Sequence, residues 1–246
     1  MSNEIIVYWA APALPKNLFS SPLNFGFKEP TSVLNALRKD KNKEPQPQSV
    51  FSCPAHRSML KNVYSIDAIE NYTFNLEPAH SNPSTVPWVN DPYDFASPRQ
   101  CSLDGYTDIE PAYSWLFFAS EPLIARFTAP YLPTVSPAEG SFLVCGEFDI
   151  GQWYRPFVLN YMVPKHVPYL TILKNNPLCF VEFKTDKNIV FKKYEVNDVL
   201  NFYSNKCLKS PVEVGRSYTL EFRYEWLNEA INAKTIIYEI EKNLLQ

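Results

Sequence analysis

The sequence predicts a mainly β protein, an antiparallel β-sandwich or jelly roll with one or two C-terminal α-helices. Hydrophobic residues make up 46% of the 246 residues and aromatic residues 15%, and bulky side chains of this kind pack well on pleated sheets. Short apolar runs recur along the centre of the chain with turn residues between them. The chain has 22 prolines and only 6 glycines, so its turns are expected to be stiffened by proline.

Residues 1–49 are predicted to form an opening strand followed by an extended arm. Residues 4–9, EIIVYW, are β-branched and aromatic, and the run stops before Pro12, as strands commonly do. Residues 31–37 begin with two hydroxyl side chains and then place apolar residues at helical spacing, which predicts one short helix.

Residues 50–195 are predicted to form the β-sandwich core, with a cupin-like double-stranded β-helix as the alternative closure. Apolar residues alternate within residues 63–77, which indicates strands. Turn residues at 174–177 and 185–188 favour antiparallel neighbours joined by tight turns. Further strands are expected at residues 114–119, 123–127, 142–148, 154–162, 169–173, 178–183 and 189–194.

Residues 196–246 are predicted to form a helical segment, because the apolar period changes after Asn197. One apolar stripe at alternating spacings of three and four consists of Phe222, Trp226, Ala230, Ala233, Ile237, Ile240 and Leu244. Such a stripe must be covered, either by the chain's own sheet or by a partner subunit.

The stretch FSCPAH places a thiol, Cys53, three residues before an imidazole, His56. The two side chains can approach each other only if this stretch turns helically, which Pro54 permits as a first helical residue. A nucleophilic thiol also needs a lowered pKa and a base within hydrogen-bond reach. Free cysteines are commonly buried and inert, so a buried structural role is expected for Cys53.

Metal and carboxylate chemistry have weak signals in the sequence. No H-x-D or H-x-E pair opens an iron site, although a cluster of His56, His80 and His166 remains an alternative. Glu147 and Asp149 lie two residues apart on a predicted strand, with Glu182 and Asp186 on a later hairpin, as in a paired-carboxylate site for carbohydrate. Because alternation places the first pair opposite Phe148, both are expected to face solvent. No catalytic, cofactor-binding or metal-ligating residue is therefore assigned.

Charge and cysteine usage limit the classes of partner. The net charge of −3, from 23 basic and 26 acidic residues, gives no general attraction to nucleic acid. The five cysteines include no C-x-x-C pair, which argues against a disulfide framework and a compact zinc site. The start MSNEIIVYWAAPALP lacks signal-peptide features and no apolar run reaches roughly 18 residues, so a cytoplasmic protein without a membrane span is expected.

Four segments carry a resemblance to a known group of proteins: residues 116–123 (LFFASEPL), 130–132 (PYL), 148–156 (FDIGQWYRP) and 176–183 (NPLCFVEF). Together with Cys53-Pro54 they resemble an uncharacterised family of tailed phages, notably those of cyanobacteria, over residues 50–195. The resemblance implies a phage-encoded structural or accessory protein, with phage or host proteins or a second copy as partners. It also implies the host cytoplasm or the virion as location. A cytoplasmic, cupin-like ligand-binding protein or enzyme is the alternative.

Overall fold

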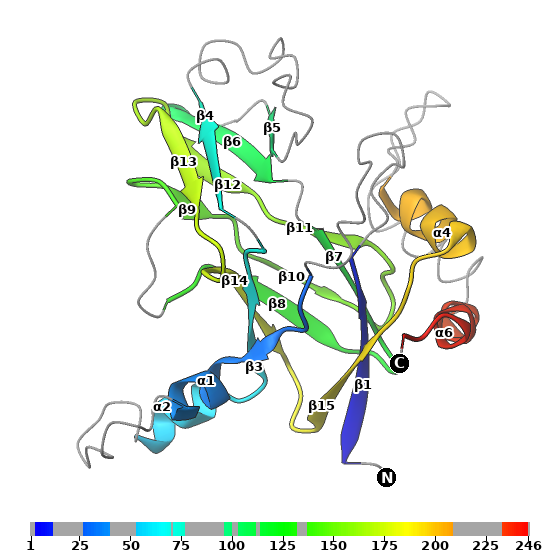
Figure 1. Cartoon of the computed structure of the whole chain (residues 1–246). Helices are drawn as coiled ribbons and strands as arrows, with labels where there is room; N and C mark the ends of the chain where they lie inside the picture. The colour runs from blue at the N-terminus through cyan, green and yellow to red at the C-terminus, as the bar shows by residue number, and fades with distance from the viewer. Residues whose placement is uncertain are drawn as a thin grey trace.

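A computed structural model confirms a mainly β fold (Figure 1). It describes residues 3–11, 27–39, 53–69, 71–76, 96–99, 103–111, 114–131, 137–208 and 233–245. Strands β1 to β15 form four sheets in this part of the chain, and nearly all of their pairings are antiparallel. None of these four sheets closes on itself, so the described strands form a sandwich and not the barrel of the cupin-like alternative.

The first sheet has the strand order β11-β7-β1-β15. Its central strand β1 pairs antiparallel with β7, placing Val7 opposite Ala119, and parallel with β15, placing Ile5 opposite Ile189. The parallel pair was not predicted, because the sequence only indicated antiparallel neighbours. The strand bounds are β1 Glu4–Ala10, β7 Ser114–Ala119, β11 Pro156–Val158 and β15 Asn188–Lys193.

The second sheet has the order β10-β8-β14-β3-β2 and is antiparallel throughout. Its strands are β10 Gly146–Asp149, β8 Ile124–Thr128, β14 Pro177–Phe183, β3 Val63–Asp67 and β2 Thr31–Ser32. Two smaller sheets lie at the top of the view in Figure 1. They consist of β5 Ala96–Arg99, β6 Tyr106–Pro111, β12 Tyr161–Pro164 and β9 Phe142–Leu143, and of β13 Tyr169–Ile172 with β4 Tyr72–Asn75.

Aromatic side chains from both large sheets fill the space between them. Alternation along β1 turns Val7 toward the second sheet, and β7 turns Phe117 the same way. Both side chains belong to one buried cluster with Phe127 and Phe183 of the second sheet. The rings of Phe127 and Phe157 stack with centroids 3.4 Å apart, and Phe117 meets Phe183 edge-on at 6.1 Å. Ring contacts therefore join the two sheets directly.

Two helices cover the other face of the first sheet (Figure 1): α4 (Asp198–Leu208) and α6 (Ala233–Lys242). The Asn197 side chain accepts a hydrogen bond from Leu200 N at 2.9 Å, as a helix N-cap does. Ile236, which the predicted stripe did not include, is buried with Tyr8 of β1. Of the stripe itself, Ile240 is buried in the same cluster, and Ala233, Ile237 and Leu244 pack against it. This half of the predicted apolar stripe thus packs on the chain's own sheet, whereas Phe222, Trp226 and Ala230 lie outside the described residues.

Two shorter helices lie near the second sheet: α1 (Val33–Lys39) and α2 (Pro54–Met59). Val33 of α1 forms a small cluster with Leu60, Val63 and Phe180, so α1 lies where residues 31–37 predicted a helix. No side chain of α2 is buried.

Several strand predictions need correction. Residues 142–148 and 154–162 each form two strands instead of one, and β2, β5 and β6 were not predicted. The turn at 185–188 does not close a hairpin, because β14 belongs to the second sheet and β15 to the first. Likewise β13 and β14, around residues 174–177, lie in different sheets. These turns carry the chain from one sheet to another.

Candidate functional site

The FSCPAH stretch does turn helically, but its thiol is exposed. Pro54 is the first residue of α2, and Arg57 N donates to the Cys53 carbonyl oxygen at 3.1 Å. Both Cys53 and His56 are exposed, so the burial expected for this thiol was wrong. The reason is that α2 packs none of its side chains into the protein. No hydrogen bond joins the Cys53 thiol to the His56 ring among the described contacts, and α2 assembles no nucleophile–base pair there.

Glu147 belongs to a row of charges across three neighbouring strands of the second sheet, which we call the charge ladder. Backbone register places Arg126 of β8 between Glu147 of β10 and Glu182 of β14. Arg126 Nε lies 2.9 Å from Glu147 Oε2, its Nη1 lies 3.6 Å from Glu182 Oε2, and Lys184 Nζ lies 2.6 Å from Glu147 Oε2. Opposite charges thus alternate along the ladder, as cross-strand neighbours prefer.

The electrostatics of the charge ladder differ from those of a glycosidase. A hydrogen bond from Lys184, and a weaker effect of the hydrogen bond from Arg126, hold the pKa of Glu147 below its usual value. This carboxyl group is therefore an anion at neutral pH. A glycosidase acid instead needs a raised pKa to protonate the leaving group. Asp186 lies apart from the ladder and pairs with Lys61 at 3.2 Å on the surface. The four carboxylates therefore make ion pairs or structural contacts and form no acid–base pair.

Asp149 is only half-exposed, because its carboxylate turns back onto the backbone instead of pointing fully into solvent as predicted. Its Oδ1 accepts hydrogen bonds from Leu123 N at 2.9 Å and Gly151 N at 2.8 Å, and its Oδ2 accepts one from Gln152 Nε2 at 2.9 Å. Residues 120–123 join β7 to β8, and the segment after Asp149 leads to β11. Asp149 thus ties together two crossings between the large sheets, and we call this contact the crossing corner.

Gly151 completes the crossing corner by close backbone approach. A Cβ atom added to this residue would lie 2.7 Å from the Cα atom of Pro122, closer than real Cβ contacts. Ile150 N also donates to the Leu123 carbonyl at 2.9 Å, and Ala119 N donates to the Ile150 carbonyl at 3.0 Å. The segment FDIGQWY is therefore a structural junction in this fold.

Buried hydroxyl groups lie beneath α6 on the outer face of the first sheet. Tyr8 donates a hydrogen bond to Glu241 Oε1 at 2.9 Å, and the hydroxyls of Tyr154 and Tyr194 lie 3.1 Å apart. Burial, followed by the contact with Glu241, raises the pKa of Tyr8 to about 12. Burial and the neighbouring tyrosine likewise raise the pKa of Tyr194. The Tyr8 hydroxyl stays neutral at physiological pH and anchors α6 to β1, whereas the hydroxyls of Tyr154 and Tyr194 contact each other.

The structure does not assemble the histidines within its described part. His56 and His166 are exposed, and His80 lies outside the described residues. No group of three or more His, Cys, Asp or Glu side chains suited to a metal ion occurs in the ranges that the structure describes.

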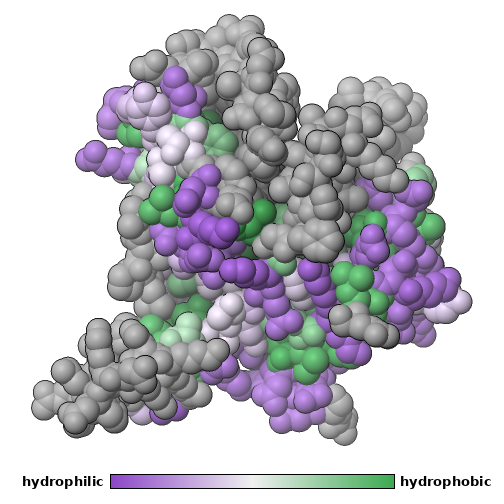
Figure 2. Space-filling view, viewed as in Figure 1, coloured by the Kyte–Doolittle hydropathy of each residue, from purple (hydrophilic) through white to green (hydrophobic). Residues whose placement is uncertain are grey.

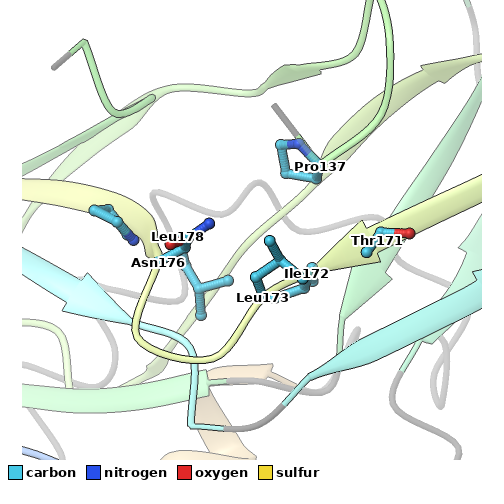
Figure 3. A pocket seen from close by; sticks show the side chains of 7 residues that line it. Pro137, Thr171, Ile172, Leu173, Asn176 and Leu178 are labelled. Atoms are coloured by element: carbon cyan, nitrogen blue, oxygen red, sulfur yellow. The ribbon is translucent and has the colours of Figure 1, made fainter. Parts of the chain in front are cut away.

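A shallow pocket lies beside the turn between β13 and β14 (Figure 3). Its volume of about 50 Å³ is far smaller than the roughly 300–1,000 Å³ of sites for drug-sized ligands. It has room for one or two water molecules. Its lining is mostly apolar and consists of Pro137, Thr171, Ile172, Leu173, Asn176, Pro177 and Leu178.

Comparison with known proteins identifies no relative. No family model, no curated protein and no solved structure matches this chain. The resemblance to a phage family therefore stays a prediction from the motifs. Among the described residues, no helix is long and apolar enough to cross a membrane.

Proposed function

We propose that this chain is a non-enzymatic structural or accessory protein of a phage, acting through its surfaces on other proteins. The observation that carries the proposal is the filled interior of the sandwich. Val7, Phe117, Phe127 and Phe183 fill the space between the two large sheets, and each is at most 1% exposed, so they leave no room there for a ligand. A core of interlocking rings supports a rigid scaffold.

The polar side chains support the same proposal. The carboxylates that sequence reasoning singled out hold strands together, through the charge ladder at Glu147 and the crossing corner at Asp149. Because these carboxylates are engaged in structural contacts, they support contacts with partner proteins at the surface, and not catalysis, as the function of the chain. The phage origin rests on the motif resemblance, and the proposed location is the host cytoplasm or the virion.

Quantitative mass spectrometry of gradient-purified particles of the encoding phage tests the virion role. The expected result is a constant ratio of this chain to the major capsid protein across gradient fractions and preparations. A copy number that falls with each purification step, as for a contaminating host enzyme, would contradict the proposal. Lysates from the middle of infection provide the matched sample, because an accessory protein would be abundant there and associated with other phage proteins.

A further inference from the structure

Among the described strands, none pairs with the outer edge of β15 along most of its length, and we call this the open edge. β15 is the last strand of that sheet, and Asn188 N donates to the Asn3 carbonyl at 2.9 Å while Tyr194 N donates to the Trp9 carbonyl at 3.1 Å. These two bonds fix which backbone groups face β1. Because successive residues of a strand point their amides to opposite sides, those of Ile189 and Phe191 point away from β1. No described strand pairs with them.

The chain itself shows that this edge accepts an extended segment. Residues 243–245, directly after α6, run antiparallel to the end of β15, where Leu244 bridges to Tyr194. Leu245 N donates to the Lys193 carbonyl at 2.9 Å, and Glu195 N donates to the Asn243 carbonyl at 2.9 Å. This short segment, residues 243–245, pairs with only the last part of the edge. Extending it along β15 would bring it to Phe191 and then Ile189.

The side chains of β15 define what such a segment would meet. Ile189 and Phe191 are half-buried against the core, and Figure 2 shows a hydrophobic area over β15 surrounded by hydrophilic surface. Lys193 lies with its Nζ 5.0 Å from the centre of the Trp9 ring. Neither Lys192 nor Lys193 forms an ion pair with a residue in the described part of the chain. The open edge is thus apolar at its centre and positive at one end.

We propose that the open edge of β15 binds an extended acidic segment of a partner protein as an additional antiparallel strand. Backbone hydrogen bonds to Ile189 and Phe191 would provide affinity, and acidic side chains beside Lys192 and Lys193 would provide selectivity. A second copy that paired through its own β15 would bring the same lysines and not the acids that neutralise them. The inference rests on the proposed function, because it names one surface through which the protein would act.

Binding of a synthetic peptide to the full-length chain tests this inference. The probe is a short fluorescent peptide of alternating valine and threonine with two glutamates at its N-terminal end, the end that lies near Lys192 in an antiparallel strand. Fluorescence anisotropy should show saturable binding, and hydrogen exchange should slow at the amides of Ile189 and Phe191. A peptide N-methylated at the amides that face β15, and a peptide with lysines in place of glutamates, should both bind more weakly.

Variants of the chain locate the binding. Ile189→Pro removes an outward-facing donor without removing a bond to β1, so it should abolish peptide binding, whereas Ile189→Val should leave it unchanged. Because proline can also destabilise the strand, the double substitution Lys192→Glu and Lys193→Glu provides an independent surface test. It should raise the Kd by up to about tenfold with unchanged circular dichroism.

Three results would overturn the inference: absence of peptide binding, equal binding of the N-methylated peptide, or a dimer in sedimentation that Ile189→Pro dissociates. The dimer would identify a second copy as the occupant. Peptide binding without the protein in phage particles or phage complexes would count against the proposed function alone. Presence in particles without peptide binding would count against the open edge alone.

Discussion

Replacing Asp149 should destabilise the protein far more than replacing its neighbour Glu147. In Asp149→Ala, the backbone amides of Leu123 and Gly151 lose the carboxylate oxygen that lies 2.9 and 2.8 Å away. Hydrogen bonds to a charged group contribute about 1.5–3 kcal/mol each, so losing two should lower the free energy of unfolding by about 3–6 kcal/mol. Since domains are stable by only about 5–15 kcal/mol, this is a large fraction of the total.

Urea unfolding, followed by tryptophan fluorescence and far-UV circular dichroism, measures this loss. Asp149→Asn keeps an acceptor oxygen but loses the charge, so its free energy of unfolding should lie between those of the wild type and Asp149→Ala. Glu147→Ala is the matched control, because it removes a carboxylate from the same strand whose ion pairs are exposed. If Asp149→Ala lost no more stability than Glu147→Ala, the crossing corner would not be a structural junction.

Three other changes test the packing of the sandwich and its helices. Gly151→Ala should lower the free energy of unfolding by at least about 1–3 kcal/mol in urea, because backbone atoms crowd the new methyl group. Ile240→Ala should cost about 2–5 kcal/mol in the same assay, whereas Tyr238→Ala, exposed on the same helix, should cost little. The pKa of Tyr8 rises from 10.0 to about 12 on folding, so its contribution to stability is complete below pH 10 and lost as pH rises through 12. Between pH 10 and pH 12, the free energy of unfolding of Tyr8→Phe should therefore fall less than that of the wild type. An equal fall in both proteins would contradict the raised pKa of Tyr8.

Local patterns predicted the strands far better than their partners. The alternating or continuous apolar runs gave β1, β7 and β13 nearly to the residue, because their side chains bury on one or both faces. The sheet that each strand joins depends on contacts distant in sequence. Turn residues at 185–188 predicted a reversal, but a reversal between two packed sheets uses the same residue types as a hairpin within one sheet.

The same limit explains the errors at the candidate sites. Glu147 faces solvent as alternation predicted, but Asp149 stands at the end of its strand, where the chain leaves the sheet and alternation ceases to apply. Its main partner, Leu123 N, is 26 residues away, so no local pattern reveals it. Pro54 permits the helical turn that forms after Cys53, yet burial of a side chain depends on what the whole helix packs against.

The positive charge of the β15 lysines has two effects on the open edge: it opposes pairing between identical strands and it favours acidic partners. Charged side chains on an exposed edge oppose pairing between identical strands, which protects a sandwich from edge-to-edge aggregation. On the proposed binding, the same charges favour an acidic segment over a neutral or basic one, so Lys192 and Lys193 act against one class of partner and for another. An edge without charge would bind extended segments through its backbone regardless of their sequence. Selectivity at this edge therefore depends on the end nearest residues 243–245, where the chain's own segment already shows the geometry that a partner strand would continue.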